Sequence, residues 1–239
     1  MIPKLLGMPS CFQKGLFALS AVLSFASFIL ILVAMGSQKW MTGKILCKTG
    51  AELVNATDPE LIKFMGEIYY GLFEGRKMRQ CGLGGRSSRF KMFPHLVKKV
   101  NMMLHVTIIL SLSVAFSFAL VSCGFCFLNL LKVPFRAIQG PAGVALWNLV
   151  AGGCTMLAVT AFVSAVKLHQ LTERIANFRE NGFQFLILEE KYMPSFWLCV
   201  ASATIHGLNL VIVALSAIHF PTLKTKTEEA NVTAEDIMY

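Results

Sequence analysis

The sequence is poor in charged residues. Only 15% of its 239 residues are Asp, Glu, Lys or Arg, whereas about a quarter of the residues in an average soluble domain are charged. Hydrophobic residues make up 55% of the chain. This composition argues against an ordinary soluble globular protein and points to a membrane protein.

Four stretches lack Asp, Glu, Lys and Arg altogether, and they contain 24, 32, 30 and 32 residues: Gly15–Gln38, Val100–Leu131, Ala137–Val166 and Tyr192–Leu223. About 20 apolar residues cross a hydrocarbon core of ~30 Å, so each stretch can span once, and none is long enough for two helices and a turn. The spans must be helical, because unpaired backbone groups are too costly in lipid. The first stretch is longer than the apolar region of a signal peptide, about 7–15 residues, which favours a retained anchor. We therefore predict an all-α membrane protein with a four-transmembrane-helix bundle.

The spans also lack the groups that move ions or protons. Pumps, ion-coupled transporters and voltage sensors carry buried acids or bases, and these stretches have none. We interpret His105 and His206 as donors and acceptors of hydrogen bonds between helices rather than as a proton or metal path. Small residues recur at helical spacing and predict close helix packing. They are Ser20, Ser24 and Ser27 in the first span and Ser111, Ala115, Ala119 and Ser122 in the second.

Motifs of nucleotide binding and catalysis are missing as well. Gly82–Gly85 is rich in glycine, but no Gly-Lys-Ser/Thr follows and no strand–turn–helix unit surrounds it, so we interpret these glycines as a turn. No cysteine–histidine or serine–histidine–acid arrangement occurs with supporting context, so we expect no enzyme. We likewise expect no cofactor, no metal, no nucleic acid and no small-molecule substrate.

Two rules disagree about the orientation of the chain. Four spans put both termini on one side, and the connection 39–99, which carries 12 basic and 5 acidic residues, would lie in the cytosol by the positive-inside rule. That rule weakens for connections of about 60 residues, and this one contains an even number of cysteines, Cys47 and Cys81, which suits the oxidising side. The sequons at Asn55 and Asn231 lie on opposite faces, so at most one can be glycosylated. We predict cytosolic tails and an extracellular long connection with a Cys47–Cys81 disulfide.

The predicted order is 1–14 cytosolic, 15–38 span, 39–99 extracellular, 100–131 span, 132–136 cytosolic, 137–166 span, 167–191 extracellular, 192–223 span and 224–239 cytosolic.

The extracellular parts are expected to form a small β-sheet. Three segments have the composition of β-strands: Ile45–Cys47, Ile68–Phe73 and Met78–Cys81. A turn is expected at Glu74–Lys77, between the last two. Asp58 and Pro59 are typical of a helix start. Phe183–Leu188 should add another strand. Before it, the third helix is expected to continue beyond the membrane as an amphipathic extension that ends at Asn181-Gly182, with an apolar stripe formed by Leu168, Leu171, Ile175 and Phe178.

These features resemble a known superfamily. Three features are similar to the claudin-type tetraspan proteins: Trp40 after the first span, the step Gly71-Leu72-Phe73, and the loop cysteine Cys81. One feature differs, because Cys47 precedes the Gly-Leu step, whereas both claudin cysteines follow it. The chain resembles the clarin family more closely. That resemblance is carried by LCKTG (46–50), LVNATDPEL (53–61), KFMGEIYYGLF (63–73), RQCGLGGR (79–86), VKLHQLTERIANF (166–178), SFW (195–197) and TAEDIMY (233–239). It implies a plasma-membrane protein of hair-cell stereocilia, needed for bundle upkeep, mechanotransduction and hearing, and glycosylated at Asn55.

The carboxyl end predicts a further contact. Ile237, Met238 and Tyr239 place apolar residues at the last and third-last positions, which suits strand addition to a PDZ domain, although a disordered polar tail is the simpler alternative. We predict a non-enzymatic membrane scaffold whose partners are the lipid bilayer, other membrane proteins, a cytosolic PDZ-type protein and a second copy of itself. The alternatives are a claudin-like paracellular barrier and an auxiliary subunit of an ion channel.

Overall fold

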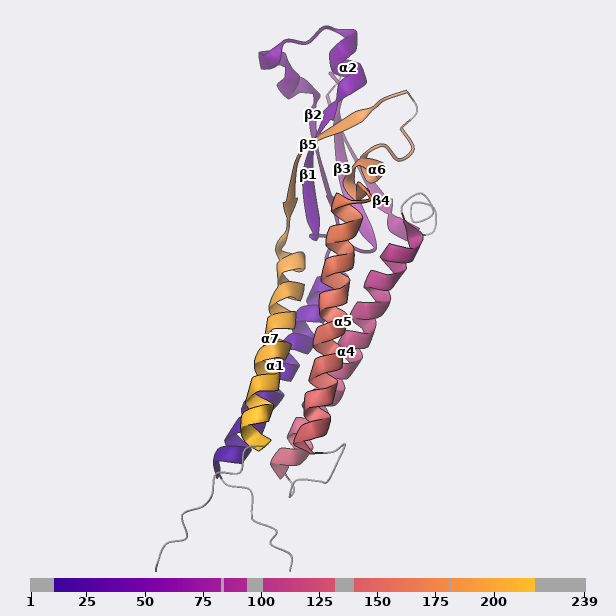
Figure 1. The fold of residues 1–239 in the computed structure, drawn as a ribbon. Helices are drawn as coiled ribbons and strands as arrows, with labels where there is room; N and C mark the ends of the chain where they lie inside the picture. Colours follow the sequence, from indigo (N-terminus) through magenta and orange to yellow (C-terminus); the bar gives the residue numbers. More distant parts are fainter. Residues whose placement is uncertain (1–10, 83, 94–100, 132–139, 181, 218–239) are drawn as a thin grey trace, which may run out of the picture.

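The protein has two parts stacked along one axis, a helical bundle and a β-sheet beyond one end of it (Figure 1). The computed structural model describes residues 11–82, 84–93, 101–131, 140–180 and 182–217. The long helices are α1 (Cys11–Gly36), α4 (Met102–Leu131), α5 (Pro141–Lys167) and α7 (Pro194–Ala217). All four are long and apolar enough to cross a membrane. At 1.5 Å per residue they measure about 36–45 Å, more than a hydrocarbon core of ~30 Å. The predicted fold class is therefore confirmed.

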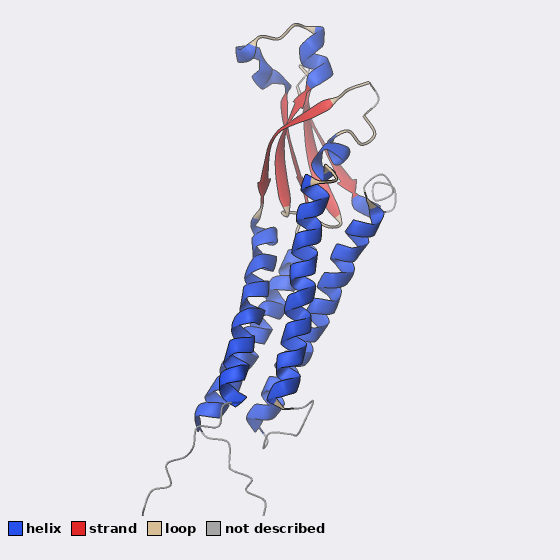
Figure 2. Cartoon of the chain, viewed as in Figure 1, coloured by secondary structure: helices blue, strands red, loops and turns tan. Residues whose placement is uncertain are grey.

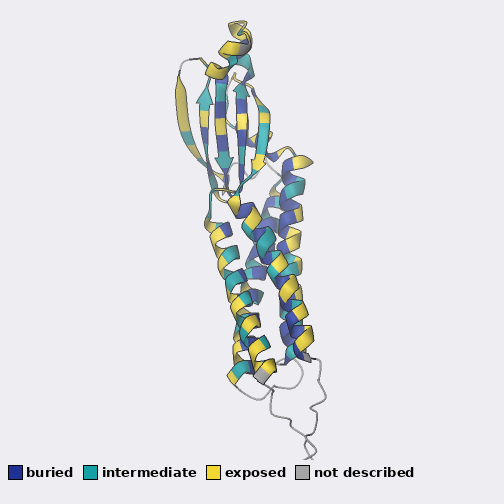
Figure 3. Cartoon of the chain, turned by 90° about the vertical axis from the view of Figure 1, so that its left-hand side faces the viewer, coloured by how far each residue is buried: buried dark blue, intermediate teal, exposed yellow. Residues whose placement is uncertain are grey.

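The bundle keeps its small residues inside and its large apolar residues outside. α1 packs against α4 and α7, and α5 packs against the same two helices. The predicted stripes face inward, because every one of their residues is buried: Ser20, Ser24, Ser27, Ser111, Ala115, Ala119 and Ser122. Large apolar residues such as Val22, Phe25 and Leu110 are exposed, and Figure 3 shows exposed residues (yellow) along the outside of the bundle. This arrangement suits a bundle in lipid, where small residues let helices approach closely.

The sheet is antiparallel and draws strands from both connections (Figure 2). Its order is β4-β3-β2-β1-β5, formed by β1 (Met41–Cys47), β2 (Met65–Tyr70), β3 (Glu74–Gln80), β4 (Gly85–Lys91) and β5 (Phe185–Tyr192). Two short helices, α2 (Lys48–Leu53) and η1 (Asp58–Phe64), lie at the end far from the bundle. The strand that was expected near Phe183–Leu188 is thus present as β5, and it pairs with β1.

The turns of the sheet differ from the prediction. The prediction of a turn at Glu74–Lys77 is wrong, because β3 begins at Glu74 and the chain reverses at Gly71–Phe73. Gly71 suits this position because a Cβ there would collide with the backbone carbonyl of Ser37. The strand β4 was not predicted at all. It follows a turn in which Gly82 and Gly84 have φ of +85° and +93°, a conformation that favours glycine, as expected for these residues.

One prediction about a helix is also wrong. The third long helix does not continue through the apolar stripe, since α5 ends at Lys167 and Gln170 adopts φ +49° before the separate helix α6 (Leu171–Ala176). Leu168 is therefore 77% exposed, while Leu171 and Ile175 are buried. The helix start predicted at Asp58 and Pro59 is confirmed by η1, which begins at Asp58, although its N-cap is Thr57.

Candidate functional site: the sheet and its junction with the bundle

Trp40 forms the junction between the first helix and the sheet. Its side chain is fully buried and its Nε1–H donates to the carbonyl of Ala34, 2.7 Å away, in the last turn of α1. That carbonyl is one of the groups that a helix end leaves without an intrahelical partner. The ring also packs against Phe162 of α5, with centroids 4.9 Å apart. Trp40 therefore fixes the direction in which β1 leaves the bundle.

The Gly71-Leu72-Phe73 step rests on the bundle. Leu72 is buried, and its carbonyl lies 2.7 Å from Nε2 of His105 in the first turn of α4. His105 thus bonds to the sheet's turn rather than to another helix, which corrects its interpretation. Phe73 is exposed. This step therefore holds the turn of the β2–β3 hairpin against the first turn of α4.

Cys47 and Cys81 are joined by a disulfide with a Cα–Cα distance of 5.5 Å. The bond links the end of β1 to the residue after β3, two strands that lie on either side of β2. Cys47 is buried, and Phe64 packs in the same core. The disulfide therefore closes the end of the sheet that is far from the bundle.

Asn55 lies at that far end of the molecule. It follows α2, has φ +46°, and is exposed together with Thr57, the third residue of its sequon. The side chain of Asn55 is therefore accessible to an oligosaccharide as far as the described residues are concerned. The second sequon, at Asn231, and the carboxyl-terminal residues Ile237, Met238 and Tyr239 lie outside the described residues.

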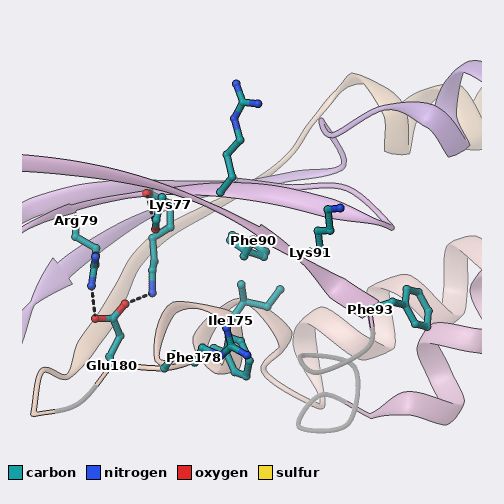
Figure 4. A pocket seen from close by; sticks show the side chains of 11 residues that line it. Lys77, Arg79, Phe90, Lys91, Phe93, Ile175, Phe178 and Glu180 are labelled. Atoms are coloured by element: carbon teal, nitrogen blue, oxygen red, sulfur yellow. Dashed lines mark hydrogen bonds and ion pairs between the residues drawn. The ribbon is translucent and has the colours of Figure 1, made fainter.

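A buried charge cluster, which the sequence analysis missed, connects the sheet to the segment after α6 (Figure 4). Lys77 is only 4% exposed, and its Nζ donates to the carbonyl of Ala176 at 2.8 Å and to Oε1 of Glu180 at 2.5 Å. Arg79 donates to the other carboxylate oxygen of Glu180 at 2.8 Å. Burial lowers the pKa of Lys77, and the hydrogen bond that Lys77 donates to Glu180 offsets part of that effect.

An exposed counterpart lies on β1 and β5. Glu189 forms ion pairs with Lys44 at 2.9 Å and Lys191 at 2.5 Å. Hydrogen bonds from Lys191 and Lys44 lower the pKa of Glu189 to about 2, and the bond with Glu189 raises the pKa of Lys44. Water screens such surface pairs, so they contribute little to stability.

A polar network links all four helices in the middle of the bundle. Its members are Ser20, Ser24 and Ser27 of α1, Ser122 and Cys126 of α4, Asn148 of α5, and Ser202, His206 and Asn209 of α7. Asn148 is the hub. Its Nδ2 donates to Oγ of Ser122 at 2.6 Å, and its Oδ1 accepts from His206 and Asn209 at 3.0 Å each.

The network fixes the role of His206. Because Oδ1 of Asn148 can only accept, Nδ1 of His206 carries the proton and donates. Its Nε2 then accepts from the hydroxyl of Ser27 at 2.7 Å, and Ser27 in turn accepts from Ser202 at 2.6 Å. A neutral imidazole satisfies every one of these bonds. The predicted role of His206 in bonding between helices is confirmed.

Comparison with known proteins agrees with this architecture. The family model described as Clarin-2-like matches residues 12–213. The chain is 60% identical to Clarin-2 of Mus musculus over 232 residues, which cover 97% of this chain and 100% of the relative. It is 40% identical to Clarin-1 of Homo sapiens over 232 residues, which cover 97% of this chain and 100% of that protein. It is 26% identical to Clarin-3 of Homo sapiens over 210 residues, 86% of this chain and 88% of that protein.

Proposed function

Because the chain belongs to the clarin family, a family of multi-pass membrane proteins, we propose that it is a non-enzymatic plasma-membrane scaffold that organises other membrane proteins. In this proposal the sheet faces the exterior and both termini lie in the cytosol. Family membership also supports a site of action at hair-cell stereocilia, in bundle upkeep, mechanotransduction and hearing.

The observation that carries the proposal is the stiff connection between bundle and sheet. β1 follows α1 through the buried Trp40, and β5 runs into α7 through Met193, whose N–H donates to the carbonyl of Trp40 at 2.9 Å. The N–H of Ser195 donates to the carbonyl of Lys39 at 3.1 Å. Two helices of the bundle, α1 and α7, therefore hold the neighbouring strands β1 and β5 at one point. Such a frame presents a surface in a fixed orientation, as a scaffold requires.

Hair cells that lack their own Clarin-2 would test this role. We expect the wild-type chain to restore bundle shape and transduction currents, and Trp40→Ala, which loosens the junction, to restore neither. Trp197→Ala serves as the control, because Trp197 is 58% exposed on α7, whereas Trp40 is fully buried. Full rescue by Trp40→Ala at normal surface levels would contradict the proposal. Continuous junctional strands in transfected epithelial cells would favour a claudin-like barrier instead.

The orientation has its own test. We expect Asn55→Gln to abolish a glycosidase-sensitive mobility shift on gels and Asn231→Gln to leave it unchanged, since only the sequon beside α2 would meet the glycosylation machinery. The opposite pattern would invert the topology.

The tail adds a proposed partner of PDZ type. An apolar last side chain and a free carboxylate fit the strand-addition mode of these domains, so we expect the last three residues to be needed for capture by a PDZ array. Deleting Ile237, Met238 and Tyr239 should abolish capture and leave surface delivery unchanged. Equal capture of the shortened chain would exclude this partner.

A further inference from the structure

The face of β3 and β4 that packs toward the segment after α6 carries more positive than negative charge. Arg79 of β3 lies directly opposite Arg86 of β4 in the strand register, and Lys77 lies two residues from Arg79 on the same face. Like charges directly opposite each other destabilise a strand pair. Glu180 is the acid bonded to two of these cations, so the group of four has a net charge of +2.

Two of these cations have unused hydrogen-bond donors. Nε of Arg79 is buried without a hydrogen-bond partner. Arg86 is exposed, and within the described part of the chain it has no hydrogen-bond or ion-pair partner. Each oxygen of Glu180 already accepts a bond from Lys77 or Arg79. A buried donor without a partner costs free energy, so the face is complementary to an additional acceptor with negative charge.

A cavity of about 210 Å³ lies beside these groups. Its lining includes Arg79, Arg86, Glu180 and two aromatic residues, Phe183 and Phe185. It is smaller than the roughly 300–1,000 Å³ of pockets for drug-sized ligands, so it suits one small group. Phe183 is 43% exposed and supplies an apolar wall at its mouth.

The position of the cavity indicates where its ligand comes from. The cavity borders Cys81, which follows the end of β3 farthest from the bundle. β3 has 7 residues, and at about 3.4 Å per residue it rises some 24 Å from the turn seated on α4. A lipid headgroup in the adjoining leaflet is too far away to enter, and the ligand must arrive from the aqueous side.

We propose that this cavity binds the carboxylate or sulfate group of an acidic saccharide. Arg79 and Arg86 donate charge-assisted hydrogen bonds to the oxyanion, for which the planar guanidinium fork is well suited. The ring of Phe183 packs against the apolar face of the sugar. The choice of a saccharide rests on the proposed orientation of the sheet, since such sugars are exterior ligands, but binding to purified protein does not depend on that orientation.

Calorimetry on the full chain in nanodiscs of zwitterionic lipid tests the site, with a heparin-derived sulfated disaccharide as the probe. We expect Arg86→Gln to weaken binding about tenfold, the loss of one charge-assisted hydrogen bond. Arg89→Gln is the matched control, because it removes the same charge from the same strand while Arg89 faces the other side of the sheet, opposite Arg76. Its affinity should stay within about twofold of the wild type, as expected for a rim charge. Equal losses in both variants would reduce the binding to general electrostatic attraction and overturn the site.

Two further arms identify the ligand class. Phe183→Ala should weaken binding of the disaccharide and leave binding of inorganic sulfate unchanged. Sulfate that binds as tightly as the disaccharide, or an aspartate-rich peptide that binds where the disaccharide does not, would overturn the saccharide assignment. Arg86 is exposed, so its replacement leaves the fold intact, and an unchanged melting temperature checks this. If the glycosylation test shows the opposite topology, the binding results on purified protein are unaffected. A failure of the proposed orientation can therefore be distinguished from a failure of the proposed binding site.

Discussion

Removing the carboxylate of Glu180 should loosen the sheet more than any change at an exposed acid. In Glu180→Gln, one of the two oxygens that accept from Lys77 and Arg79 becomes an amide nitrogen that can only donate, and the negative charge that faces both cations is lost. Breaking a buried ion pair by deleting one partner typically costs about 3–5 kcal/mol. We therefore expect the contact between β3 and the segment after α6 to weaken by about that amount, while the bundle stays folded.

Hydrogen exchange of the β3 and α6 amides measures this loss. If exchange there is limited by local opening, it should accelerate by roughly two to three and a half orders of magnitude, since 1.4 kcal/mol corresponds to a factor of ten. Glu189→Gln is the control, because Glu189 also binds two lysines but at the surface, where water screens the pairs. Replacing both charges, in Lys77→Met with Glu180→Leu, should recover most of the protection.

The pH dependence supplies a second readout. Burial holds the pKa of Lys77 below its value of 10.5 in the unfolded chain. Between these two pKa values the unfolded state binds more protons, so stability rises with pH in that interval. Glu180→Gln removes the group that favours the charged lysine, so it should lower the native-state pKa of Lys77 further and extend this rise to lower pH. Equal exchange in Glu180→Gln and Glu189→Gln, or a fall in protection as pH increases toward 10.5, would refute the reasoning.

Three other substitutions test the remaining contacts. Trp40→Ala removes a fully buried ring and its bond to Ala34, so it should cost about 3–5 kcal/mol and lower the melting temperature far more than Trp197→Ala. Cys47→Ser breaks the disulfide and should cost about 2–4 kcal/mol. Surface delivery should then fall and thiol labelling at position 81 should rise, and normal values of both would argue against a structural bond. Asn148→Ala removes the hub of the bundle network and should cost about 1–2 kcal/mol, because hydrogen bonds between membrane helices average about 0.6 kcal/mol each. Thr160→Ala, at an exposed residue that bonds only within its own helix, should leave the melting temperature unchanged.

The bundle could be predicted from the sequence because one physical rule governs it. Ionised side chains are excluded from lipid, so runs without charge reveal the spans directly, and inward small residues follow from close packing. The structure extends the first and third helices to Cys11 and Lys167 and begins the fourth at Pro194. These shifts are small because charge and proline mark helix ends only within a few residues.

The sheet was harder to predict because its determinants are distant in the sequence or weak in pattern. β4 (GRSSRFK) has no alternation of apolar and polar residues, since its face toward α6 is itself partly charged. The break after α5 depends on a left-handed residue, Gln170, for which no glycine or proline signal exists. Lys77 and Glu180 are separated by 103 residues, so only the fold brings them together. The network in the bundle was foreseen for His206, but the hub role of Asn148 was not.

The two halves of the molecule are therefore stabilised by different interactions, and this predicts where substitutions do harm. In the bundle, each polar contact is modest, because an alternative partner is available to the same group when helices separate in lipid. In the sheet, a disulfide, a buried ion pair and the Trp40 junction each act alone at a separate place. Contacts that share no partner do not compensate for one another, so their losses add. A scaffold that acts by presenting its sheet should accordingly lose function through single changes at the sheet and junction, and through several combined changes in the bundle.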